Sequence, residues 1–192
     1  FHIWIGIDHI LFLIALLLPS VLRYKDGSWQ PVLNFHDAFI TVLKVVTAFT
    51  IAHSITLSVA ALGIVSLPSK FVESVIAFSV VLAALNNLYP VVRDRTWTVA
   101  FAFGLIHGFG FANVLSDLSL PSGTLAIALL SFNIGVELGQ LAIVAVVFPV
   151  IFALRDHRVY LPLKLRLGSA VIALIACGWM IDRIFELEMM PF

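Results

Sequence analysis

The chain has 192 residues, of which 61% are hydrophobic and 11% are charged, and its mean hydropathy is +1.10. A soluble globular domain carries about 25% charged residues, so this composition excludes a disordered protein, a nucleic-acid-binding protein and an ordinary soluble enzyme. Eleven basic residues balance eleven acidic ones, which gives no electrostatic argument for an anionic partner. The single cysteine, Cys177, excludes an internal disulfide framework. We therefore expect an integral membrane protein whose main partner is the lipid bilayer.

Six apolar segments are long enough to cross a membrane, which takes about 20 residues in a helix. They are roughly residues 2–22, 38–65, 71–89, 97–116, 123–154 and 166–185. Long apolar runs without period-two alternation are typical of helices. The sequence thus predicts an all-α bundle of six transmembrane helices that forms a single domain over residues 1–192. Because the chain starts at Phe1 with a hydrophobic segment, we expect a further segment to precede it in the full protein.

Basic residues are distributed unequally between the two sets of loops. Eight lie after the first, third and fifth apolar segments: Arg23, Lys25, Arg93, Arg95, Arg155, Arg158, Lys164 and Arg166. The other side has only Lys70 and Arg183. Cytoplasmic loops carry an excess of Lys and Arg. This asymmetry predicts that both termini lie outside the membrane, which we expect to be a bacterial inner membrane.

A short internal similarity links the second and fifth segments, which run in opposite directions. Residues 49–52 read Phe-Thr-Ile-Ala and residues 132–135 read Phe-Asn-Ile-Gly. Many transporters consist of two inverted three-helix repeats, and such a repeat would place these stretches in equivalent positions. A match of only four residues can also arise by chance, so the alternative is a bundle without internal symmetry.

Several ionisable side chains lie inside the apolar segments, where they are costly and usually functional. With a rise of about 1.5 Å per helical residue, Asp8, His9 and His53 fall in the outer half of the membrane. His107 falls near the midplane, and His2 lies at the outer mouth. We predict that Asp8, His9, His53 and His107 share one divalent ion, with His2 as an entry ligand.

The donor types limit which ion this site would hold. Neutral imidazole and carboxylate suit nickel, cobalt and zinc, whereas a copper(I) carrier would need thiolate or thioether ligands. Asp8 could also orient a ligating histidine rather than bind the ion itself. In the alternative interpretation each histidine bonds a backbone carbonyl across a helix interface, and no ion is involved.

Further polar residues extend from this site along two segments. Asn133, Glu137 and Gln140 follow an i, i+4, i+7 pattern and so share one helix face, and Ser54 belongs to a polar stripe next to His53. We interpret these four residues as a transport path. In the fourth segment Gly104 and Gly108 form a small-xxx-small pair, which predicts close approach of another helix beside His107.

Four ordered blocks give the chain a resemblance to a known family. Residues 2–9 fit the pattern H-x5-D-H, and further blocks follow at 52–57, 103–112 and 132–140. In these blocks the sequence resembles the HupE/UreJ family of membrane proteins, which is associated with metal supply to hydrogenase and urease. The resemblance implies a nickel or cobalt permease in which His2, Asp8 and His9 handle the metal. His107 would match the first histidine of that family's histidine-glycine block.

The fourth segment departs from the family's pattern. The characterised permease branch has a second histidine-glycine pair and a glutamate after the first, whereas residues 109–112 here read Phe-Gly-Phe-Ala. The resemblance is therefore to a divergent branch, whose members often carry an outward-facing N-terminal domain.

Three functions are compatible with these residues. In the first, the protein is a transporter that moves a divalent transition metal through the His/Asp site. In the second, it is an intramembrane hydrolase in which histidines and an aspartate hold zinc with one position open for water, and Ser54 or Glu137 assists. In the third, it is a structural membrane anchor that holds a metal only for folding. The sequence favours the transporter over the enzyme.

Overall fold

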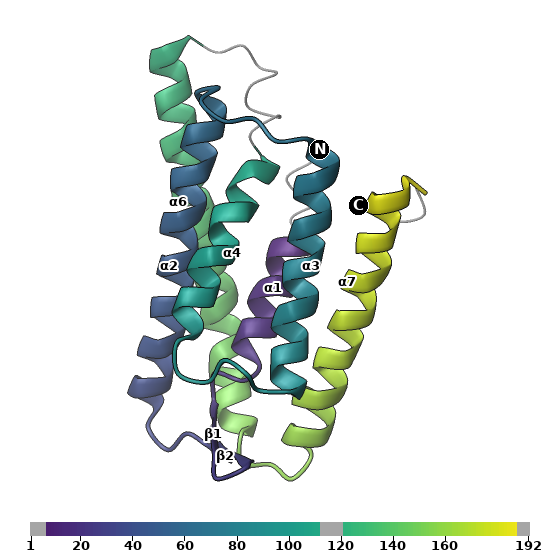
Figure 1. The fold of residues 1–192 in the computed structure, drawn as a ribbon. Coiled ribbons are helices and arrows are strands. Elements are labelled where there is room, and N and C mark those ends of the chain that lie inside the picture. Colours follow the sequence, from purple (N-terminus) through teal and green to yellow (C-terminus); the bar gives the residue numbers. More distant parts are fainter. Residues whose placement is uncertain (1–6, 112–120, 188–192) are drawn as a thin grey trace.

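The computed structural model describes residues 7–111 and 121–187. Figure 1 shows a helical bundle with one small hairpin. Its elements are α1 (Ile7–Leu17), β1 (Leu22–Lys25), β2 (Ser28–Pro31), α2 (Phe35–Ala61), α3 (Ser69–Leu88), α4 (Thr96–Gly110), α6 (Ser122–Leu154), the π-helix η2 (Tyr160–Leu167) and α7 (Gly168–Phe185). The prediction of a predominantly helical membrane protein is confirmed, because each of the six predicted segments contains an α-helix.

Four helical stretches in the described part of the chain are long and apolar enough to cross a membrane. They are Phe35–Ala61, Ser69–Leu88, Gly123–Leu154 and Tyr160–Phe185. The helices α1 and α4 have 11 and 15 residues, which is short of the roughly 20 that a full crossing takes. Both adjoin residues outside the described ranges, so six complete spans and the inverted repeat stay predictions.

The first helix is shorter at its C-terminal end than the predicted segment, which ran to residue 22. It ends at Leu17, where the Ser20 amide donates to the Leu17 carbonyl in a turn. A two-stranded antiparallel hairpin follows, with the turn residues Asp26 and Gly27 both at positive φ. Asp-Gly is a preferred pair in tight hairpin turns, so the hairpin had a sequence signal that hydropathy alone did not reveal.

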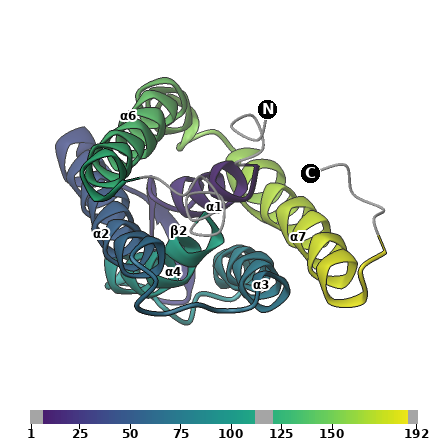
Figure 2. The same cartoon turned by 90° about the horizontal axis from the view of Figure 1, so that it is seen from above.

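The short helix α1 lies inside the bundle. Seen from above, it is surrounded by α2, α4 and α3 on one side and by α6 and α7 on the other (Figure 2). Its side chains Phe12, Leu13, Ala15 and Leu17 are all at most 4% exposed. Because α1 is enclosed in this way, the polar residues of its first turn are placed within the bundle.

The loops alternate between the two ends of the bundle. The hairpin, the α3–α4 loop and the α6–η2 loop gather at one end, which we call the hairpin end, and the α2–α3 loop lies at the other (Figure 1). All eight of the loop cations named above belong to the hairpin end. At the opposite end Lys70 pairs with Glu186 and Arg183 with Glu73. Which end faces the cytoplasm stays a prediction.

The close packing predicted for Gly104 and Gly108 is confirmed. A Cβ atom on Gly104 would lie 2.5 Å from the carbonyl oxygen of Phe49, and one on Gly108 would overlap Thr56 and the carbonyl oxygen of His53. Helix α4 can therefore approach α2 so closely only because both positions lack a side chain. This contact positions His107, which lies on the same helix between the two glycines.

Candidate metal site

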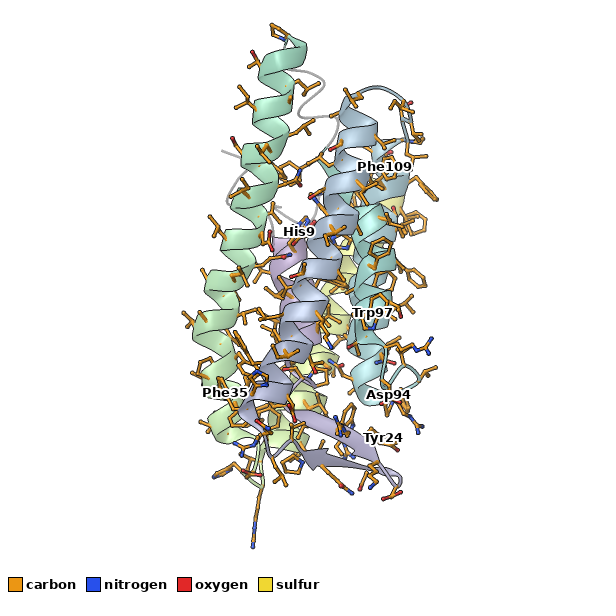
Figure 3. The ribbon with its side chains drawn as sticks, turned by 90° about the vertical axis from the view of Figure 1, so that its left-hand side faces the viewer. His9, Tyr24, Phe35, Asp94, Trp97 and Phe109 are labelled. Atoms are coloured by element: carbon orange, nitrogen blue, oxygen red, sulfur yellow. The ribbon has the colours of Figure 1, made fainter. Side chains whose placement is uncertain are left out.

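The first turn of α1 presents a hydrogen-bonded acid–histidine pair. The His9 Nδ1 atom lies 2.9 Å from Asp8 Oδ1, and both side chains are 14% exposed. If Nδ1 carries the proton of a neutral ring, it donates to the carboxylate and Nε2 keeps the lone pair. Nε2 of His9 is buried and has no hydrogen-bond partner among the described residues. Figure 3 shows His9 inside the bundle, close to α2.

Helix α4 adds His107 to this pair. Asp8, His9 and His107 each offer a ligand atom, and these three atoms lie within 4.8 Å of one another. The His9 and His107 ring centroids are 5.1 Å apart. His107 is fully buried: its Nε2 atom lies 2.8 Å from the hydroxyl of Ser79, and its Nδ1 atom has no partner within the described ranges.

Helix α2 places His53 next to the three-residue group. The His53 and His9 ring centroids are 5.6 Å apart, and the ring is fully buried between Phe49 and Phe132. Neither ring nitrogen of His53 makes a well-formed hydrogen bond in the part of the chain that the structure describes, although the side chain of Asn133 on α6 lies near enough to interact with this ring. His53 is not one of the three residues whose ligand atoms lie within 4.8 Å of one another, so it flanks that group.

The donors in this arrangement are of a kind that could hold a cation. Buried polar atoms without partners each cost about 1–3 kcal/mol, and four such ring nitrogens belong to His9, His53 and His107. A carboxylate lies among them. Nitrogen and oxygen donors of this kind bind nickel, cobalt and zinc, and a bound cation would satisfy several of these nitrogens at once.

Comparison with known proteins agrees with this chemistry. The family model described as HupE / UreJ protein matches residues 1–183. The chain belongs to the HupE/UreJ family. Comparisons with curated proteins and with solved structures find no match. The match over residues 1–183 confirms the resemblance inferred from the four sequence blocks. The family is associated with nickel and cobalt transport.

The remaining predicted site residues of this HupE/UreJ protein are less closely grouped. His2 lies outside the described residues. The Ser54 hydroxyl donates to the Thr50 carbonyl within its own helix. Gln140 is buried, and its Oε1 atom accepts a 3.1 Å hydrogen bond from the Thr50 hydroxyl, which joins α6 to α2.

The other two polar residues of α6 are half-buried. Asn133 donates a 2.9 Å hydrogen bond to the Leu129 carbonyl, and its Oδ1 atom is buried without a partner in the described ranges. Glu137 lies one helical turn further along α6. Beyond Gln140 the buried residues of this helix are apolar: Val144, Phe148 and Ile151. The polar face therefore ends at Gln140 in this conformation.

A separate cavity opens at the hairpin end. It has a volume of about 160 Å³ and is lined by the last turns of α1, the first half of α2, the hairpin and the α3–α4 loop. Along α1 its wall begins at Leu13, and along α2 it ends at Val46. The rings of Phe12 and Phe49 come next on these helices, 5.3 Å apart and each 2% exposed. Both rings also lie 5.1 Å from the His107 ring, so along α1 and α2 they are placed between the cavity wall and the His/Asp site.

Sequence reasoning missed Ser79 and several aromatic residues that contact the site, among them Phe12 and Phe49. Phe12 and Phe49 lie in apolar runs, where an aromatic residue is ordinary core packing and carries no special signal. Ser79 lies within the apolar stretch Ile76–Val81. A single hydroxyl inside a membrane helix is the signal that could have drawn attention to it, because such groups often bond across helices.

Proposed function

We propose that this HupE/UreJ protein transports a divalent transition metal, nickel or cobalt or zinc, through the site formed by Asp8, His9, His53 and His107. One observation carries the proposal: buried ring nitrogens without well-formed hydrogen bonds, from three helices, gather next to the half-buried carboxylate of Asp8. Ionisable groups at membrane depth are expensive. Grouping them around a shared cation gives them a partner, whereas three histidines and one aspartate that served only in packing would have no physical reason to lie together.

In this proposal the cation is the cargo and each side chain has a defined task. Asp8 supplies negative charge and holds the His9 ring through its 2.9 Å bond to Nδ1. His9 offers Nε2 and His107 offers Nδ1, the two ring atoms without partners. His53 serves as the neighbouring ligand that receives or stabilises the ion during passage, and His2 remains the proposed entry ligand.

The two sides of the site differ in access. Asp8 and His9 retain some exposure at the first turn of α1, toward the end of the bundle opposite the hairpin. Passage toward the hairpin-end cavity is blocked by Phe12 and Phe49. We therefore propose entry from the opposite end and release into the cavity when these rings separate, with Ser54, Asn133, Glu137 and Gln140 as the polar groups nearest the path on α2 and α6.

Equilibrium metal binding by the purified protein tests the proposal. The wild type should bind one Ni²⁺, Co²⁺ or Zn²⁺ ion. His53→Ala and His107→Ala should each weaken binding at least about tenfold, since the loss of even an indirect partner of a metal ligand costs about 10–100-fold. His157→Ala is the matched control, because His157 is exposed in the α6–η2 loop.

Transport itself is then measured in proteoliposomes that contain a trapped metal-sensitive dye. Flux should require the wild-type site, and the His157→Ala variant should behave as wild type. Absence of binding by the wild type, or an equal loss in the His157→Ala control, would overturn the proposal. Metal binding without flux would favour the hydrolase or the structural anchor.

A further inference from the structure

Ser79 links helix α3 to the candidate metal site. Its side chain is fully buried, and its Oγ atom lies 2.7 Å from the carbonyl oxygen of Ile76 and 2.8 Å from Nε2 of His107. No other side chain is hydrogen-bonded to the His107 ring in the described part of the chain. The hydroxyl is therefore the hydrogen-bond contact that can select which nitrogen of this ring carries the proton.

The protons in this pair can be assigned from the acceptors. A serine hydroxyl has one hydrogen, and a backbone carbonyl oxygen can only accept. The short contact with the Ile76 carbonyl therefore requires the Ser79 hydroxyl to donate there. Its oxygen is then left as the acceptor toward His107, so Nε2 of His107 carries a hydrogen and donates it to Ser79.

The assignment of the proton to Nε2 also determines the state of the other ring nitrogen, Nδ1. A neutral imidazole has one N–H, and the second nitrogen bears the lone pair. With Nε2 protonated, the lone pair of His107 is on Nδ1, the buried nitrogen that has no partner. A metal ligand must present such a lone pair, and the hydrogen bond at the far nitrogen commonly selects the tautomer.

We infer that Ser79 is a positioning residue: it holds His107 in the Nε2–H form and makes Nδ1 the atom that binds the transported cation. The part about the cation rests on the proposed function. The part about the tautomer concerns the protein without metal and can be tested separately.

The first measurement uses the metal-free protein with ¹⁵N-labelled histidine. The nitrogen chemical shifts of His107, assigned by loss of its signals in His107→Gln, report which ring nitrogen carries the proton. We expect a protected, slowly exchanging Nε2–H in the wild type. Ser79→Ala should lose that protection and populate the Nδ1–H form, whereas Ser79→Thr, which keeps a hydroxyl, should retain the wild-type signals.

A matched control lies on the same helix. The Ser74 hydroxyl donates a 2.7 Å hydrogen bond to the Lys70 carbonyl, as Ser79 does to Ile76, and no histidine accompanies it. Ser74→Ala should leave the His107 signals unchanged. It removes the same kind of helix hydrogen bond, so it separates a general effect on α3 from an effect on the histidine ring.

The second measurement is the affinity for Ni²⁺ or Co²⁺. We expect Ser79→Ala to lower it by about tenfold or more, the usual effect of losing a partner of a metal ligand, and we expect Ser79→Thr and Ser74→Ala to stay near wild type. A His107 ring protonated on Nδ1 in the wild type, or unchanged signals in Ser79→Ala, would overturn the inference. If the wild type binds no metal but the tautomer depends on Ser79, the proposed function fails and the positioning role stands.

Discussion

Asp8 is the one acidic group in the proposed site, and its charge can be tested apart from its shape. Asp8→Asn keeps an oxygen that can accept from His9 Nδ1, at 2.9 Å in the wild type, but removes the negative charge that attracts a cation. We expect the fold to persist and metal affinity to fall by about tenfold to 100-fold. Asp26→Asn, at the exposed turn of the hairpin, is the control. The measurement is calorimetric titration of both variants and the wild type with Ni²⁺. If Asp8→Asn bound Ni²⁺ as tightly as the wild type, Asp8 would act only as a hydrogen-bond acceptor for His9.

At the scale of single residues, the sequence identified the groups that are costly in a membrane. Asp8, His9, His53 and His107 were predicted because charge and imidazole are rare in apolar segments. Ser79, Phe12 and Phe49 were not, since hydroxyl and aromatic groups are common there and only their contacts distinguish them. Contacts between helices depend on rotation about each helix axis, which hydropathy does not determine.

The contact between α2 and α4 sets the position of His107, and Gly108 makes that contact possible. Gly108→Ala would push a methyl group into Thr56 and the carbonyl oxygen of His53. Forcing an extra carbon into a packed interface typically costs about 1–3 kcal/mol, so thermal stability in detergent should fall together with metal affinity. In Gly135→Ala on α6 the new Cβ would meet no atom within 4 Å, and this variant should behave as wild type. If Gly108→Ala had wild-type stability and affinity, this packing would not position the site.

At the scale of elements, helix existence was easier to predict than helix ends. The fifth predicted segment, 123–154, nearly coincides with α6 (Ser122–Leu154), because apolar residues continue to both ends. The last segment, predicted to start at residue 166, is extended backwards by η2 from Tyr160. Hydropathy alone did not predict this extension, because the basic residues Lys164 and Arg166 lower the local hydropathy and are typical of a loop.

The distribution of loop cations was predictable for the whole molecule because it depends only on chain order. Consecutive helices must return the chain to alternate ends, so the basic residues of alternate loops gather together, as they do at the hairpin end (Figure 1). The cavity at this end was not predictable. It depends on α1 stopping at Leu17 and on the hairpin covering the space beneath it, and both follow from turn geometry.

The whole molecule thus has a site near the start of α1 and a cavity at the hairpin end, with Phe12 and Phe49 between them. If these rings close the path, removing one should open the site to the hairpin end. In a Cys177→Ser background, the thiol introduced by His9→Cys reports access of a cationic thiol reagent added from the hairpin side. Labelling should be slow with Phe12 present and markedly faster in Phe12→Ala, because the smaller side chain leaves a gap beside Phe49.

Phe148→Ala is the control for this experiment. Phe148 is equally buried, at 1% exposure, but its ring contacts are with Phe35, Phe39 and Phe152 and not with the histidines of the site. Removing a buried phenylalanine costs about 3–5 kcal/mol at either position, so both variants are compared at a temperature where they remain folded. Labelling should stay slow in Phe148→Ala, since its cavity does not connect the site with the hairpin end. Fast labelling with both aromatic rings intact, or equal rates in the two variants, would show that Phe12 does not separate the two compartments.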